Sequence, residues 1–383
     1  MPDLEVDGPH PGVSAAVADV RVVDHHVHSI VREAPDRAGF LAMLTESDRA
    51  AAVAGWDTQL GIAVRRWCAP VLGLERSASG ETYLERRRAM DPREAGAAFL
   101  APAGIRTLIV DTGFRGDSLL DLADLAMLAG ARVEPVVRLE SIAEDLARTG
   151  VTAAAYPDAL RGAIAAALPA SVGFKTILAY RGGLDMDPEP PTDAEVIDAA
   201  GRWLGEVERS GSPRLTDRVL LRFGIWEAVR TGRPLQVHTG FGDSDLDLHR
   251  ADPSLLTPFL RRTEGLCPVL LLHTYPFHRT AGYLAQMFGH VHVDVGLAVH
   301  HTGAASERIV AESLELAPLS RVLFSTDAWG LPELYLLGSL LFRRALARTL
   351  GRWVADGDWA LTDALRAVAL IGHQNAERVY GLA

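Results

Sequence analysis

The stretch Val20-Arg21-Val22-Val23-Asp24-His25-His26-Val27-His28 joins a short β-branched run to a cluster of ionisable residues. The same pattern, an apolar run that ends in a polar residue, recurs along the chain. The further runs are residues 107–110 before Asp111, 134–137 before Arg138, 171–174 before Lys175, 234–237 before His238, 269–272 before His273, 291–293 before Asp294 and 321–326 before Asp327. Such runs are typical of strands buried on both faces, and the segments between them are long enough for crossover helices. The pattern predicts an α/β fold, a (β/α)8 TIM barrel with its functional groups at the carboxyl ends of the strands.

An open, doubly wound sheet is the alternative fold. Such a sheet carries a glycine-rich phosphate-binding loop directly after its first strand. Residues 24–28 take that place in this chain and contain three histidines and no glycine. The barrel is therefore favoured.

Two connections exceed the roughly 30 residues of an ordinary barrel unit. The first, residues 31–101, has helix-like periodicity at 39–44, 58–71 and 81–90, and we expect a helical insertion that forms a lid over the barrel mouth. The second holds the acidic, proline-rich stretch 185–191 before a predicted helix at 194–208. Residues 362–380 predict a closing helix that ends at Gly381. We expect one domain over residues 1–383.

Composition excludes several classes of partner. The 383 residues are 48% hydrophobic and carry a net charge of −11, which argues against nucleic acid and anionic membrane surfaces as partners. No run of about 18 uncharged apolar residues is present to span a bilayer. Asp3, Glu5 and Asp7 lie where a secretory leader would be basic, so we expect a cytoplasmic protein. Two cysteines are too few for a disulfide framework or a cysteine metal site. The expected partners are a small-molecule substrate and further copies of the chain in a homo-oligomer.

Lys175 is the only lysine among the 38 basic residues, and every other cationic side chain is arginine. Arginine stays protonated in proteins, whereas a desolvated lysine can lose its proton and act as a nucleophile, a base or a carbamate-forming amine. A coding bias toward arginine is the alternative explanation. The position of Lys175 at a predicted strand end favours a chemical role for this lysine.

The predicted strand ends gather a set of metal-ligand side chains. His26 and His28 flank one residue, so both side chains point to the same side of an extended strand. Neutral imidazole is the commonest nitrogen ligand of zinc and similar ions. One barrel mouth would bring these two histidines together with Lys175, His238, His273 and Asp327. The set as a whole predicts a metal site.

In this order the ligand set resembles the amidohydrolase superfamily, whose barrels use His-x-His on strand 1, a lysine on strand 4 in many members, single histidines on strands 5 and 6, and an aspartate on strand 8. The resemblance covers nearly the whole chain after about residue 20. Four stretches look like the branch found as the N-terminal half of nodulin/glutamine-synthetase fusion proteins: residues 173–181 (GFKTILAYR), 236–243 (QVHTGFGD), 272–279 (LHTYPFHR) and 323–328 (LFSTDA).

The resemblance implies roles for these residues. His26, His28 and Asp327 would hold one divalent ion, and His238 with His273 a second ion if two are bound. A carboxylated Lys175 would bridge the two ions, whereas in single-metal members the lysine is absent or unmodified. Zinc is the expected metal, with manganese as the alternative. If Lys175 stays an amine, it would bind a substrate carboxylate.

The implied chemistry is hydrolysis by metal-activated water. Asp327 would take the proton from that water and pass it to the leaving amine, and Lys175 and His273 complete the expected catalytic set. Four further residues are candidates for substrate binding: Tyr180, Arg181, His278 and Asp243. Each of three of these residues has an alternative interpretation. Arg181 would pair with Asp185 or Asp187, the loop around Asp243 would be a solvated acidic loop, and His278 would pack at the start of a helix.

Three functions compete on this site. The first is hydrolysis of a C–N amide bond in a small carboxylate-bearing substrate, with a γ-glutamyl amide suggested by the fusion of relatives to a glutamate-amidating enzyme. The second is metal-dependent non-oxidative decarboxylation, whose family members usually lack the strand-4 lysine. The third is a non-catalytic barrel, which the complete ligand set disfavours.

Overall fold

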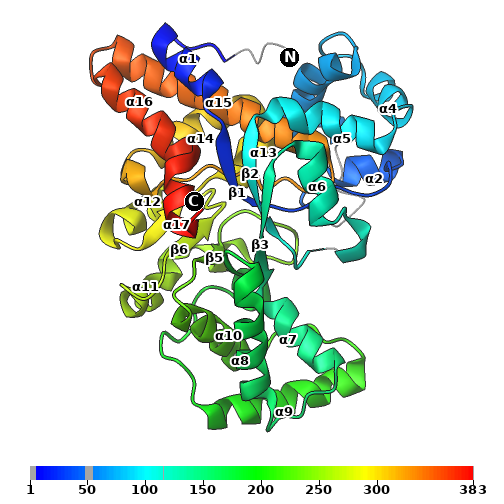
Figure 1. Ribbon diagram of the computed structural model, residues 1–383, viewed down its shortest axis with the longest axis vertical. Coiled ribbons are helices and arrows are strands. Elements are labelled where there is room, and N and C mark those ends of the chain that lie inside the picture. The colour runs from blue at the N-terminus through cyan, green and yellow to red at the C-terminus, as the bar shows by residue number, and fades with distance from the viewer. Residues whose placement is uncertain (1–5, 48–54, 115, 383) are drawn as a thin grey trace.

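The computed structural model describes residues 6–47, 55–114 and 116–382, so residues 48–54 of the expected lid and both ends of the expected domain lie outside the described residues. Within them, seven strands form one parallel sheet in chain order, and helices surround it (Figure 1). The strands are β1 Val22–Val27, β2 Ile105–Asp111, β3 Arg132–Arg138, β4 Gly173–Thr176, β5 Leu235–His238, β6 Val269–Leu272 and β7 Val291–Val293.

The helices lie in the connections between strands and at both ends of the described chain. Before the third strand these are α1 Pro11–Asp19, α2 Arg37–Ala42, α3 Gln59–Ala63, α4 Gly80–Arg88, α5 Pro92–Leu100 and α6 Leu122–Ala129. From there to the seventh strand they are α7 Leu139–Arg148, α8 Tyr156–Ala167, α9 Asp193–Ser210, α10 Arg218–Arg230, α11 Thr257–Thr263 and α12 His278–Met287. The remaining ones are α13 Gly296–Thr302, α14 Ser306–Ser313, α15 Pro332–Ala355, α16 Leu361–Ala369 and α17 Asn375–Tyr380.

The sheet curls around a small apolar interior. Alternate residues of the strands, among them Val23, Ile109 and Leu270, form one buried cluster that Tyr380 of α17 completes. A second, larger cluster packs the other faces of the strands against the helices. Apolar residues therefore fill the space between the strands, and polar groups are left for the carboxyl ends.

Seven of the eight expected strands form the sheet, whereas the described residues 321–326 make only one isolated bridge, between Val322 and Val293. The segment nevertheless bonds to both neighbours: Leu323 N–H donates to the Val293 carbonyl, and the Phe324 carbonyl accepts from His25 N–H. A regular ladder is interrupted because the Asp24 carboxylate accepts the N–H and hydroxyl of Thr326 at 2.9 and 2.6 Å. A side chain thus replaces the backbone partner of a strand.

The long connection after β1 contains α2, α3, α4 and α5, together with a π-helical stretch, η3, at Val64–Cys68. These helices overlap the periodic stretches at 39–44, 58–71 and 81–90. The predicted helix at 194–208 falls within α9, which a capping box at Thr192 and Glu195 begins. The predicted closing helix is divided into α16 and α17 by a π-helical stretch, and Gly381 ends it at a φ of 63°.

Hydrogen bonds from one arginine connect α15, the longest helix, to α1. The guanidinium of Arg343, on α15, is buried and donates to the carbonyls of Val17 and Val20 at the end of α1. Hydrogen bonds to a charged group contribute about 1.5–3 kcal/mol each. Among the described residues, no helix is long and apolar enough to cross a membrane.

Candidate metal centre

The six predicted ligand residues meet at one end of the sheet. His26, Lys175 and His238 lie within β1, β4 and β5, and His28 and His273 directly follow β1 and β6. Asp327 ends the segment that bonds to both β7 and β1, and its N–H donates to the His26 carbonyl. All six are buried and line a single cavity of about 630 Å³. The carboxyl ends of the strands therefore bring together residues as far apart in sequence as His26 and Asp327.

His26, His28 and Asp327 form the tightest part of this group. The Nε2 atoms of His26 and His28 lie 3.2 and 3.6 Å from Asp327 Oδ1. Two ligand atoms on a tetrahedral zinc ion at bonds of about 2.0–2.1 Å would be roughly 3.3 Å apart. These spacings match those of ligands around one ion.

A hydrogen bond fixes which nitrogen of His26 faces the site. The Gln236 side-chain nitrogen donates to the His25 carbonyl at 2.8 Å, and because a carbonyl only accepts, the Gln236 oxygen must face His26. That oxygen accepts from His26 Nδ1–H at 2.8 Å. Nε2 of His26 therefore presents a lone pair to Asp327 and the cavity, as a metal ligand requires.

His28 is oriented in the same manner. Its Nδ1 lies 3.3 Å from the backbone carbonyl of Asp111, which can only accept a hydrogen bond. The proton therefore belongs on Nδ1 and the lone pair on Nε2. Phe114 packs against the ring at a centroid distance of 4.6 Å.

The other three residues lie beside this group. Lys175 Nζ is 3.1 Å from His26 Nε2, and His273 Nδ1 is 3.4 Å from Asp327 Oδ2. The rings of His238 and His273 are adjacent, with centroids 4.6 Å apart. A second ion would find its nitrogen ligands here.

Several buried ligand atoms of the group have no hydrogen-bond partner. Among the described residues these include Nε2 of His238, both ring nitrogens of His273 and Oδ1 of Asp327. A buried polar atom without a partner costs about 1–3 kcal/mol. Four such atoms around one cavity fit a site that a divalent cation completes.

Burial sets the protonation of the histidines. It lowers the pKa of His28 to about 4 and holds the pKa values of His26, His238 and His273 well below the usual range. All four imidazoles are therefore neutral near pH 7, which is the ligand form.

Burial also shifts the lysine and the aspartate toward their neutral forms. It lowers the pKa of Lys175 to about 8, although the nearby Asp111 and Asp327 carboxylates act in the opposite direction. It raises the pKa of Asp327 to about 7, against the influence of His28 and Lys175. A neutral amine and a proton-accepting carboxylate are thus both accessible near neutral pH.

The backbone is strained at two of the ligands. His273 and Asp327 have φ angles of 69° and 52°, and Thr274 has 36°, all in the left-handed region. The Asp294 carboxylate accepts the N–H of His273 at 3.1 Å, the hydroxyl of Ser325 at 2.8 Å and a hydrogen bond from His25. Such conformations persist where the surroundings impose them and are common at functional sites.

The candidate substrate residues Tyr180, Arg181 and Asp243 line the same cavity. Arg181 donates to Glu144 at 3.2 Å, while its Nε and Nη1 are buried without a hydrogen-bond partner. The alternative pairing of Arg181 is wrong, because Asp185 pairs with Arg218 and Arg250, and Asp187 with Arg222. Two donors of Arg181 are thus available for a substrate anion.

Tyr180 and Asp243 form the wall next to His238. The Tyr180 ring lies 4.5 Å from the His238 ring, and its hydroxyl accepts from Asp243 N–H at 3.4 Å. Gly242 is required here, because a Cβ atom at this position would lie 2.0 Å from the Tyr180 hydroxyl. Burial and the adjacent Asp245 raise the pKa of Asp243 to about 8.

His278 lies apart from these residues. Its Nε2 is 2.8 Å from Glu312, its ring stacks on Tyr275, and it is not among the described residues that line the cavity. This placement at the start of α12 agrees with the packing alternative for His278.

Several residues of the site had no role in the sequence analysis. Gln236 orients His26, and Asp111, paired with Arg138 at 2.5 Å, orients His28. Gln236 precedes His238 by two residues, so the two-residue period of a strand would have placed both side chains on one face. Asp111 and Arg138 each directly follow a predicted strand, and this position is the sequence feature that could have identified them as site residues.

A curled parallel sheet with this set of ligand residues at its carboxyl ends is typical of the metal-dependent hydrolase class of proteins. The model of the amidohydrolase family matches residues 23–382, and the chain belongs to that family. A solved Lactobacillus casei protein assigned as a metal-dependent hydrolase is similar, with a TM-score of 0.84 and 30% identity over 96% of this chain and 97% of that one.

Two further relatives are more distant or partial. Protein fluG of Emericella nidulans is 35% identical over 225 residues, which are 56% of this chain, and the chain spans only 26% of the length of fluG. The uronate isomerase of Thermotoga maritima has a TM-score of 0.62 and 14% identity over 97% of both chains, a likeness that shows the fold alone.

Replacing Gln236 by leucine tests the orientation of His26. Without the amide, His26 loses the acceptor that keeps its proton on Nδ1, and we expect zinc affinity to fall roughly 10- to 100-fold. Competition with a fluorescent chelator measures this affinity. Gln374→Leu, a change at an exposed glutamine, is the control and should bind zinc as the unmodified protein does. Equal affinities for both variants would contradict the assigned role.

Proposed function

We propose that this protein is a metal-dependent amidohydrolase that cleaves the C–N amide bond of a small carboxylate-bearing substrate, with a γ-glutamyl amide as the first candidate. One observation carries the proposal: partnerless buried ligand atoms of His238, His273 and Asp327 share a cavity with two partnerless donors of Arg181. The first set suits a cation and the second a substrate carboxylate.

The proposed ligands are His26, His28 and Asp327 for one ion, with His238, His273 and a carboxylated Lys175 for a second. Zinc suits the imidazole-rich set, and manganese is the alternative. A divalent ion bound here would lower the pKa of a water molecule toward neutrality and polarise the scissile carbonyl.

The chain itself would bind the substrate and move the proton. Arg181, whose Nε and Nη1 have no hydrogen-bond partner, would donate to the substrate carboxylate while its Nη2 stays bound to Glu144. Asp327, whose pKa is raised to about 7, would accept a proton from the attacking water and return it to the leaving nitrogen. Lys175, buried with its pKa lowered to about 8, would react as a neutral amine with CO2, forming an N–C bond and releasing one proton.

We further propose that residues 31–101 form a lid on a closed eight-unit barrel. Gly39, Met43 and Glu46 of this segment line the cavity. A lid at that place would exclude water during the reaction. The cytoplasmic location and the homo-oligomeric state stay predictions.

Metal content tests the role of Lys175. With a bridging carbamate, we expect about two metal equivalents per chain in the unmodified protein and one or fewer in Lys175→Ala, because the bridging oxygens are lost. Added short carboxylates should restore part of the loss. Lys175→Arg keeps the charge but forms no carbamate, and should behave like Lys175→Ala. A stoichiometry near one in all three proteins would contradict the carbamate and favour a substrate-binding ammonium.

An assay with γ-glutamyl-p-nitroanilide tests the reaction. We expect metal-dependent release of p-nitroaniline, with KM raised roughly tenfold or more in Arg181→Gln and kcat much less affected, because a charge-assisted hydrogen bond contributes about 1.5–3 kcal/mol. Arg202→Gln, an exposed change on α9, should leave KM unchanged. Release of CO2 from carboxylated substrates without any amine would instead identify the decarboxylase alternative.

A further inference from the structure

The side chain of Tyr380, on the last helix α17, is buried in the interior of the sheet. Its ring belongs to the apolar cluster that contains Val23, Ile109 and Leu270, and its hydroxyl meets polar residues close to the metal centre. None of the described residues that line the metal-centre cavity belongs to α17. Any link between this helix and the metal centre must therefore pass through other side chains.

Gln236 is the first of these side chains. Its nitrogen donates to the His25 carbonyl and to the Tyr380 hydroxyl, both at 2.8 Å. Both amide protons are thus used, and the amide oxygen accepts from His26 Nδ1–H at 2.8 Å. The Tyr380 hydroxyl is therefore one of the two acceptors that keep the amide from turning over.

His25 sets the direction of the next hydrogen bond. Its Nε2 lies 3.0 Å from Asp294 Oδ2, and because a carboxylate only accepts, this nitrogen carries the proton of the neutral ring. Nδ1 then presents a lone pair, and the Tyr380 hydroxyl, 3.1 Å away, donates to it. The hydroxyl thus accepts from Gln236 and donates to His25, which joins both residues in one directed chain of hydrogen bonds.

The chain ends at a second ligand residue. Asp294 Oδ1 accepts from the N–H of His273 at 3.1 Å, from the N–H of Gly296 at 2.8 Å and from the Ser325 hydroxyl at 2.8 Å. His273 has a φ of 69°, which is uncommon for a residue other than glycine. All members of the chain are buried, namely His25, His26, Gln236, His273, Asp294 and Tyr380. A partner lost from a buried network is costly because the low local dielectric strengthens each of its hydrogen bonds.

We propose that Tyr380 is a positioning residue of the metal centre and that it couples the docking of α17 to metal binding. Through Gln236 it keeps the proton of His26 on Nδ1, and through His25 and Asp294 it supports the backbone of His273. Coupling between two equilibria is reciprocal, so a bound metal stabilises the docked helix by the same factor by which the docked helix raises metal affinity. The inference rests on the metal centre of the proposed function, but not on the reaction.

Nitrogen NMR of the histidine rings in the metal-free protein tests the positioning role. We expect His26 to be protonated at Nδ1 in the unmodified protein and at both nitrogens in a mixed population in Tyr380→Phe, because Gln236 loses one of its two acceptors. Tyr156→Phe is the matched control. The Tyr156 hydroxyl is also buried and has no hydrogen-bond partner in the described chain, so this variant should keep the tautomer of His26.

Zinc binding and amide hydrogen exchange test the coupling. We expect Tyr380→Phe to bind zinc roughly tenfold more weakly than either the unmodified protein or Tyr156→Phe. Zinc should slow exchange in residues 375–380 of the unmodified protein, and by a smaller factor in Tyr380→Phe. The Asn375 side chain donates to the carbonyls of Leu319 and Val322 at 2.8 Å, so α17 keeps other anchors and the variant should fold.

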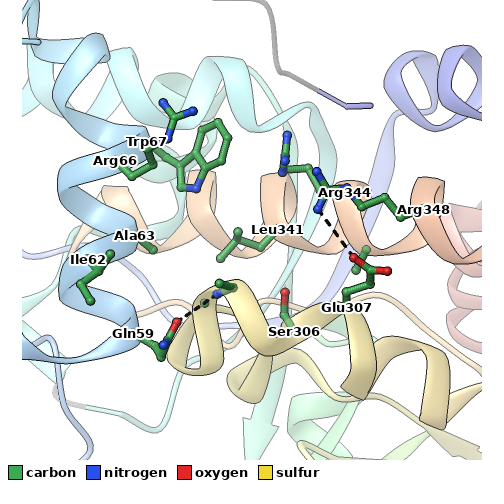
Figure 2. Close-up of a pocket in the computed structure, with 13 residues that line it drawn as sticks. Gln59, Ile62, Ala63, Arg66, Trp67, Ser306, Glu307, Leu341, Arg344 and Arg348 are labelled. Atoms are coloured by element: carbon green, nitrogen blue, oxygen red, sulfur yellow. Dashed lines mark hydrogen bonds and ion pairs between the residues drawn. The ribbon is translucent and has the colours of Figure 1, made fainter. Parts of the chain in front are cut away.

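An internal control lies at a second cavity of about 270 Å³, between α3, α14 and α15 (Figure 2). None of the described residues that line it lines the metal-centre cavity or belongs to the chain of hydrogen bonds. Zinc should therefore slow exchange in residues 306–313 of α14 less than in residues 375–380. Equal slowing in both segments would overturn the coupling, because zinc would then stabilise the whole fold and not α17 in particular.

Two further results would count against the proposal. If the folded Tyr380→Phe protein matched Tyr156→Phe in both zinc affinity and the tautomer of His26, the positioning role would be overturned. A protein that binds no zinc would overturn the proposed metal centre and the coupling with it. The tautomer comparison in the metal-free protein would still decide whether Tyr380 orients His26.

Discussion

The polar side chains at the carboxyl ends of the strands are buried, and the rest of the structure depends on this constraint. Some of them find partners in the protein, as Asp24 does in Thr326 and Asp294 does in His25. Others, in His238, His273 and Asp327, find none. At about 1–3 kcal/mol for each partnerless atom, the cluster is costly unless a bound cation offsets the loss. A divalent cation held by these side chains would offset that cost.

The surrounding structure holds the ligands in this costly arrangement. Gln236 and the Asp111 carbonyl fix the tautomers of His26 and His28, and Asp294 supports the left-handed backbone of His273. The hydroxyl of Tyr380, on the last helix, accepts a hydrogen bond from the Gln236 side-chain nitrogen at 2.8 Å. The C-terminal helix and the barrel interior thus contribute to the geometry of a site at the opposite end of the strands.

Sequence reasoning located the strand ends because a buried parallel strand is visible as a local apolar run. It therefore placed His26, Lys175 and His238 where the structure has them. Sequence reasoning did not predict features that depend on contacts between distant residues. Asp24 replaces the backbone hydrogen-bond partners of residue 326, and Glu312 pairs with His278. The Gln236 hydrogen bond joins residues 210 positions apart and has no local pattern beyond strand alternation. The order of the ligand residues along the chain can be read from local sequence patterns. The hydrogen bonds that orient those residues come from distant parts of the chain and cannot be read in this way.

Anomalous diffraction from zinc-loaded crystals at the zinc absorption edge tests the central claim most directly. The account predicts a peak about 2.0–2.2 Å from Nε2 of His26, Nε2 of His28 and a carboxylate oxygen of Asp327. A peak elsewhere in the molecule, and none between these three side chains, would contradict it.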